Sequence, residues 1–160
     1  MIKNISKICI QKYETKFDND FFVLNKAWIE ESWILEESDK KDLLNPDKII
    51  HNGGQVFFAL ENQKVIGTVA MINSSDDRFE LAKMTVQEDF RGKRIANMLM
   101  DECLKFAKEN KANEIFLISN DSLTIARNLY DKYGFKEVDL DSQKYDLSLI
   151  HISEPTRLVS

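Results

Sequence analysis

Residues 80–107 read ELAKMTVQEDFRGKRIANMLMDECLKFA, in which an apolar strand leads through a basic turn into an amphipathic helix. The first N–H groups of a helix lack acceptors within it, and its dipole is positive there. Arg91, Lys93 and Arg94 stand at this end, where three cations are disfavoured unless an anion lies among them. Gly92 lets a ligand approach the backbone. The turn therefore predicts a phosphate or pyrophosphate site, with a solvated basic turn as the alternative.

Residues 123–135, LTIARNLYDKYGF, form the second informative segment. Their apolar residues recur at helical spacing, and Gly134 stands where a C-cap glycine belongs, so a helix should end there and a strand begin at Phe135. The chain contains neither G-x-x-x-x-G-K-[ST] nor G-x-G-x-x-G after a strand, so Walker-type nucleotide sites and dinucleotide sites are unsupported.

Together these segments resemble the GNAT superfamily of acetyl-CoA-dependent N-acetyltransferases. The cofactor signature of that superfamily is [Q/R]-x-x-G-x-[G/A], and residues 89–94, DFRGKR, match it strictly only at Gly92. Asp89 and Arg94 depart from it, whereas the ending Leu-Tyr-x-x-x-Gly-Phe matches fully at residues 129–135. Further segments look like a bacterial subgroup of the superfamily, and they are residues 24–29, 35–39, 45–46, 53–54 and 65–70.

The order of strands and helices from Gln55 onward argues for helices packed on a mixed sheet. The resemblance implies an α/β (α+β) fold with a mixed, mostly antiparallel sheet of six to seven strands and helices on both faces. We expect a single domain over residues 1–146, with a first strand at 7–14 and a helix that has Asp18 as its N-cap and runs to about Trp33. Further expected elements are a second, short helix at 40–44 or 46–51, a hairpin of 55–61 with 65–72 that turns at 62–63, a strand at 79–86, and a strand at 114–119 parallel to it.

The resemblance also implies a site. Acetyl-CoA would be held by Met84, Thr85, Val86, Arg91, Gly92, Lys93, Arg94, Ile95, Ala96 and Asn120. An alkyl amine, with a pKa of about 10.4, must lose a proton before it attacks a thioester. Glu80 is the candidate base, with a structural carboxylate as the alternative. An ideal strand puts Glu80 on the same face as Ala82, Met84 and Val86, and a β-bulge would change this alternation. Tyr130 is the candidate acid for the departing thiolate, with a core tyrosine as the alternative.

These residues predict an N-acetyltransferase that moves the acetyl group directly to a primary amine of a small molecule in a ternary complex. Two alternatives stay open, namely a non-catalytic acetyl-CoA-binding sensor or partner module and a protein N-terminal or lysine acetyltransferase. Cys9 and Cys103 form no metal or redox motif, and Cys103 lies on an apolar helical stripe, so no metal site and no acetyl-cysteine intermediate are expected.

Composition and charge limit the classes of partner and the cellular location that can be expected. The net charge of −5 argues against nucleic acid as a partner. Because the apolar runs are too short to span a bilayer and there is no signal-peptide pattern, no membrane partner is expected and a cytoplasmic location is the default. A homodimer is left open.

Residues 147–157, LSLIHISEPTR, resemble the translation of a sequencing-library adapter. We therefore expect residues 147–160 to be a non-native tail, and the natural reading frame to end near Asp146. Leu147 and Leu149 alternate with Ser148 and Ile150, which is partly strand-like, so the tail could fill a vacant edge of the sheet. Its removal is expected to leave cofactor binding largely intact.

Overall fold

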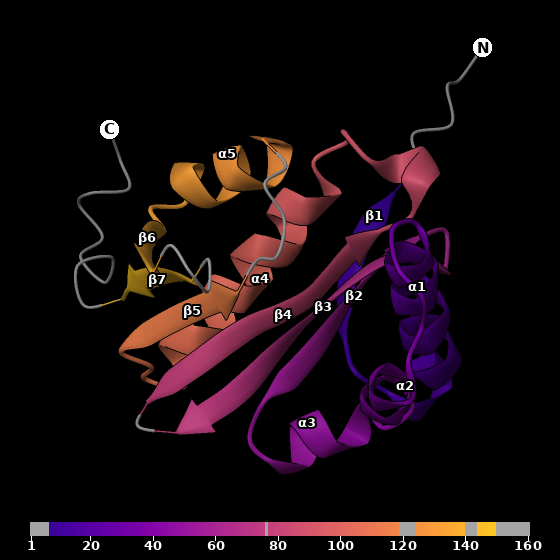
Figure 1. Cartoon of the computed structure of the whole chain (residues 1–160), viewed down its shortest axis with the longest axis horizontal. Helices are drawn as coiled ribbons and strands as arrows, with labels where there is room; N and C mark the ends of the chain where they lie inside the picture. Colours follow the sequence, from indigo (N-terminus) through magenta and orange to yellow (C-terminus); the bar gives the residue numbers. More distant parts are fainter. Residues whose placement is uncertain (1–6, 76, 119–123, 140–143, 150–160) are drawn as a thin grey trace.

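The computed structural model describes residues 7–75, 77–118, 124–139 and 144–149. They form one seven-stranded sheet in the order β1-β2-β3-β4-β5-β7-β6, with helices on both of its faces (Figure 1). The strands are β1 (Ile8–Lys12), β2 (Gln55–Glu61), β3 (Lys64–Ser75), β4 (Arg78–Val86), β5 (Glu114–Ile118), β6 (Lys136–Asp139) and β7 (Lys144–Ser148). The helices are α1 (Asp18–Glu30), α2 (Glu37–Leu43), α3 (Asp47–His51), α4 (Ile95–Glu109) and α5 (Thr124–Lys132). Among the strands of the described residues, only β4 and β5 pair in parallel, so the predicted mixed, mostly antiparallel sheet is confirmed.

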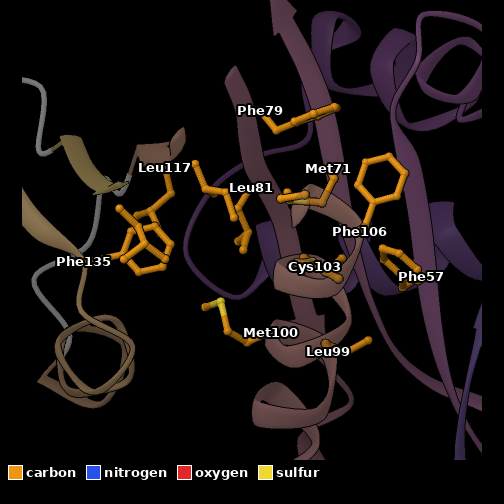
Figure 2. Close-up of a cluster of buried hydrophobic side chains, with 14 of the residues drawn as sticks. Phe57, Met71, Phe79, Leu81, Leu99, Met100, Cys103, Phe106, Leu117 and Phe135 are labelled. Atoms are coloured by element: carbon orange, nitrogen blue, oxygen red, sulfur yellow. The ribbon is translucent and has the colours of Figure 1, made fainter. Parts of the chain in front are cut away.

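Two apolar clusters hold the layers together, one on each face of the sheet. The larger lies under α4, where Phe106 packs edge-on against Phe57 and Phe79, with ring centroids 6.0 and 5.3 Å apart (Figure 2). The smaller lies under α1 and α2 and is centred on Phe21 and Phe58. Alternating side chains of the central strands feed both clusters, as expected for a sheet covered on both faces.

The N-terminal helices differ from expectation in detail. A 3₁₀ turn (Thr15–Phe17) leads into α1, so Asp18 is the first helical residue and not the predicted N-cap. The Asp18 carboxylate accepts a hydrogen bond from the Tyr13 hydroxyl at 2.6 Å. Burial of Tyr13 is the main cause that raises its pKa to about 12, and this hydrogen bond is the second cause. The helix ends at Glu30 rather than near Trp33. One further short helix was expected, at 40–44 or at 46–51, whereas the structure has two, α2 and α3.

A β-bulge in β4 decides which side chains face the site. Thr68 pairs with Thr85 but Ala70 pairs with Ala82, so β4 holds one residue more than β3 over this stretch. Lys83 lies within the bulge with φ of +56°, in the left-handed region that non-glycine residues rarely adopt.

The bulge changes the side-chain alternation along β4. Before it, Glu80 pairs with Ile72, which packs into the smaller cluster under α1. After it, Met84 and Val86 pack into the larger cluster under α4. The ideal-strand expectation that Glu80 shares its face with Met84 and Val86 is therefore wrong, for the reason anticipated.

The C-terminal strand is inside the sheet. β7 pairs with β5 on one side and β6 on the other, so the expectation of a vacant edge filled by residues after Asp146 is wrong. Leu147 and Leu149 are 4% and 3% exposed and belong to the larger cluster. Residues 147–149, the first three of the suspected tail, are therefore part of the fold.

Candidate functional site

The parallel strands β4 and β5 separate where the candidate base stands. Their register pairs run from Arg78 with Glu114 to Glu80 with Phe116 and end there, whereas β5 continues beside β7 to Ile118. The bulge follows directly in β4. Backbone groups of β4 beyond Glu80 that point toward β5 therefore lack a strand partner on that side, and such groups can hydrogen-bond an extended ligand and polarise its carbonyl. Met84, Thr85 and Val86, expected from the sequence to hold the cofactor arm, lie on this stretch.

Glu80 is half-buried on the face of the sheet that α1 covers. Burial raises the pKa of its carboxyl group, and the nearby Lys83 ammonium opposes this increase. Within the described chain, the Glu80 side chain has neither a hydrogen bond nor an ion pair. A carboxylate with a raised pKa and no protein partner is suited to accept a proton from an amine.

The predicted anion site has the expected backbone geometry. Gly92 has φ of +81° and Arg94 has φ of +67°, and α4 begins at Ile95. Met98 N–H donates to the Arg94 carbonyl at 3.2 Å, so the N–H groups of the three residues before Met98 have no helical acceptor. A Cβ atom on Gly92 would meet no atom within 4 Å, which leaves space in front of the loop. A pyrophosphate fits this arrangement of free N–H groups and open space.

The three cations of the loop do not act alike. Arg91 forms a two-pronged ion pair with Glu31, at the end of α1, with N–O distances of 2.7 and 3.3 Å, and also donates to the Val86 carbonyl at 2.9 Å. This contact raises the pKa of Arg91 and lowers that of Glu31. Lys93 lies over the Phe90 ring at 5.4 Å, and Arg94 has no ion pair with a described residue. Lys93 and Arg94 therefore supply the loop's uncompensated charge.

Tyr130 lies half-buried on α5, among aromatic side chains. Its ring centroid is 6.1 Å from that of Phe135 and 5.5 Å from that of Tyr145, and it packs against the larger cluster. This packing fixes the ring and is compatible with both interpretations of Tyr130, as an acid and as a core residue.

The helix that carries Tyr130 is anchored at its end. Gly134 has φ of +90°, and the Phe135 N–H donates to the Tyr130 carbonyl at 3.0 Å, which completes a Schellman motif and confirms the predicted C-cap. Tyr133 donates its hydroxyl proton to Asp101 of α4 at 2.7 Å. Burial and this bond raise the pKa of Tyr133 to about 12. The position of α5 on α4 is therefore set by contacts one turn from Tyr130.

The remaining expected residues contribute differently. Ile95 is buried beneath the start of α4, so it can offer its backbone N–H but not its side chain, and Ala96 follows it. Asn120 lies outside the described residues. Cys103 is fully buried, and burial holds the pKa of its thiol well above the usual range, which disfavours the thiolate that a nucleophile requires.

Two functional candidates were not found from the sequence. One is Glu31 as the partner of Arg91, for which the sequence carries no local signal. The other is Lys83, whose signal is its position where an alternating strand would place another apolar residue after Phe79 and Leu81. Across the described ranges there is no cluster of metal-ligating side chains, and no helix there is long and apolar enough to cross a bilayer.

Comparison with known proteins agrees with this geometry. Residues 20–135 match the Acetyltransferase (GNAT) family. Human N-acetyltransferase 8B is 28% identical over 123 residues, which are 73% of this chain and 53% of that protein. N-acetylaspartate synthetase from Xenopus tropicalis is 37% identical over 87 residues, 54% of this chain and 32% of that protein. The chain thus spans about half or less of the length of these relatives.

Solved structures share the fold. A GNAT-family acetyltransferase from Staphylococcus aureus Mu50 superposes with a TM-score of 0.80 at 24% identity, over 89% of this chain and 99% of that one. Other structures with this fold are complexes with coenzyme A or acetyl-CoA. With the family match covering most of the chain, the protein belongs to the GNAT family of acetyltransferases, whose acetyl donor is acetyl-CoA.

Proposed function

We propose that the protein transfers the acetyl group of acetyl-CoA directly to the primary amine of a small molecule in a ternary complex. The observation that carries the proposal is the position of Glu80, the last residue of β4 paired with β5. There a half-buried carboxylate of raised pKa stands beside strand backbone that is free to hold a thioester.

Each residue has one task in this proposal. Glu80 accepts the proton of the entering ammonium group, directly or through water, so that the amine can attack the thioester carbonyl. Backbone N–H groups of Met84 to Val86 stabilise the negative charge that develops on the carbonyl oxygen. Tyr130 gives a proton to the departing thiolate. The N–H groups at the start of α4, with the charges of Lys93 and Arg94, hold the pyrophosphate.

A small-molecule acceptor is favoured over a protein acceptor by the relatives. N-acetylaspartate synthetase is by its name an enzyme that acetylates an amino acid, and it aligns with 54% of this chain. We extend that acceptor class, a free amine of low molecular weight, to this protein.

The test is coenzyme A release across a panel of amines, with wild type, Glu80→Gln and Tyr130→Phe. Tyr130→Phe should lower turnover more than cofactor affinity, because its proton matters as the sulfur leaves. Glu80→Gln should recover activity at high pH, where more of the amine is already deprotonated. If both variants keep wild-type turnover across pH on a true substrate, these roles are wrong.

Cofactor binding is tested separately by calorimetry. Gly92→Glu should abolish acetyl-CoA binding, because it places a carboxylate at a positive-φ position that faces the phosphates. Unchanged affinity would contradict the pyrophosphate assignment. Acetyl-CoA binding without coenzyme A release on any amine would instead support the sensor or partner module.

A further inference from the structure

Two cations flank the candidate base on β4, and they differ in how they are satisfied. Arg78, two residues before Glu80, forms an ion pair with Glu114, and its guanidinium carbon lies 4.8 Å from the centre of the Phe116 ring. Lys83, three residues after Glu80, is half-buried, and the described chain offers its ammonium neither an ion pair nor a hydrogen bond. Within the described chain, one cation beside the base thus has an ion-pair partner and the other has none.

The local backbone makes the unsatisfied cation more informative. Lys83 sits in the β4 bulge with φ of +56°, a conformation that strains a residue with a side chain. Removing an ammonium group partly from water without a partner is also unfavourable. Backbone strain is found at ligand sites, so strain together with a charge that has no ion pair, both beside the candidate base, suggests that this lysine has a role in binding.

We propose that Lys83 binds a carboxylate of the acceptor, so that the acceptors of this enzyme are amino acids or similar carboxylate-bearing amines rather than simple alkylamines. This inference rests on the proposed acetyltransferase function and names the acceptor class of the same site.

The order of charges along β4 supports the pairing. An α-amino acid carries its ammonium and carboxylate on one carbon, so one molecule can present its ammonium to Glu80 and its carboxylate to Lys83. Binding at both ends orients the amine toward the backbone that follows the bulge, where the thioester is expected to lie. Such orientation reduces the entropy cost of bringing amine and thioester together.

The same pairing would act on the base. The Lys83 ammonium holds the pKa of Glu80 lower than burial alone would set it. A carboxylate on Lys83 cancels that charge, so the matching acceptor strengthens the base that must take its proton.

The test compares acceptors that differ only in the carboxylate. Coenzyme A release is measured with phenylalanine, phenylalaninamide and phenethylamine, and with lysine and cadaverine, each at matched concentration of free amine. For wild type, kcat/KM should favour the carboxylate-bearing member by about tenfold or more, the value expected for one charge-assisted hydrogen bond. Lys83→Met should bring the ratio close to one, chiefly by lowering kcat/KM for the amino acid, and Lys83→Arg should retain the preference. Lys64→Met is the matched control, because Lys64 is an exposed lysine at the hairpin turn.

Two kinetic results would overturn the inference, and a third, the absence of any activity, would move the test from kinetics to calorimetry. Equal kcat/KM within the pairs for wild type refutes it while leaving the transferase function intact. An equal fall for both members in Lys83→Met indicates a structural role and refutes it too. If no amine releases coenzyme A, the proposed function fails, and calorimetry of the same amines with the coenzyme A complex decides. Carboxylate-dependent binding that is lost in Lys83→Met then supports the site, and its absence overturns it.

Discussion

Ending the chain after Asp146 tests how much the last described residues contribute to the fold. The truncation removes Leu147, Ser148 and Leu149, together with the residues beyond them. Because β7 lies between β5 and β6, the deletion shortens an internal strand rather than an edge. We predict that the shortened protein is unfolded or only marginally stable, contrary to the expectation from sequence that cofactor binding would survive.

The magnitude follows from burial and hydrogen bonding. Leu147 and Leu149 are almost fully buried, and burying a leucine side chain contributes about 1.5–3 kcal/mol. The Leu149 N–H donates to the Asn113 carbonyl at 2.9 Å, and Leu147 and Ser148 pair with β5, bonds of about 0.5–1.5 kcal/mol each. The loss is about 5 kcal/mol or more, whereas a domain has about 5–15 kcal/mol in total.

The assay is urea unfolding followed by far-ultraviolet circular dichroism. The matched control ends after Leu149, so that it lacks residues 150–160 but keeps every described residue. We expect the control to retain the wild-type midpoint and the shorter protein to show little or no cooperative transition. If the shorter protein does not express, Leu147→Ala should lower the unfolding free energy by about 2–5 kcal/mol. Identical midpoints and slopes for the two truncations would refute the placement of these residues in the sheet.

Three further predictions concern the site and the contacts around it. Burial raises the pKa of Glu80, so the protonated side chain is compatible with folding below the ordinary glutamate pKa, and this stability is lost as pH rises through the raised pKa. Glu80→Gln should therefore raise the thermal midpoint at pH 8 and not at pH 4. An equal change of the midpoint at the two pH values would contradict this. Arg91→Met and Glu31→Gln should be non-additive in urea unfolding by about 0.2–1 kcal/mol, as expected for an exposed ion pair, and additivity would argue against the contact. Tyr133→Phe should cost about 0.5–1.5 kcal/mol, the usual contribution of one hydrogen bond, because Asp101 is exposed and water can replace the lost donor. Spectrophotometric titration of wild type should show two tyrosines that ionise near pH 12, Tyr13 and Tyr133, and Tyr133→Phe should remove one of them.

Local chemistry is what the sequence predicts well in this protein. The hairpin turn at Asn62 and Gln63 is confirmed, with φ of 49° and 71° at two consecutive residues, as in the turns that match strand twist. The C-cap at Gly134 and the start of α4 after Gly92 are confirmed for the same reason, since each depends on residues next to one another in the chain.

Features that depend on distant partners were not predicted. Arg91 pairs with Glu31, which is 60 positions away in the sequence and directly follows α1. A basic loop residue that was expected to bind phosphate is therefore neutralised by a distant carboxylate. The place of β7 between β5 and β6 depends on pairing with both strands and not on its own alternation. The role of Lys83 could be predicted only in part. Its charge interrupts the apolar alternation of β4, which the sequence shows, but the bulge is visible only in the register with β3.

The departures from the cofactor signature do not argue against a working loop. Gly92, the one strict match, has a positive φ of +81°, which favours glycine. Asp89 is exposed in a 3₁₀ turn before the loop. Arg94 adopts a left-handed conformation, which costs a residue with a side chain about 1–2 kcal/mol and which glycine adopts without strain. Arg94 thereby brings a cation without an ion pair in the described chain to the start of α4, while Arg91 is paired with Glu31. The charge lost at one position of the loop is thus replaced at another, beside N–H groups that any anion at this helix start would use.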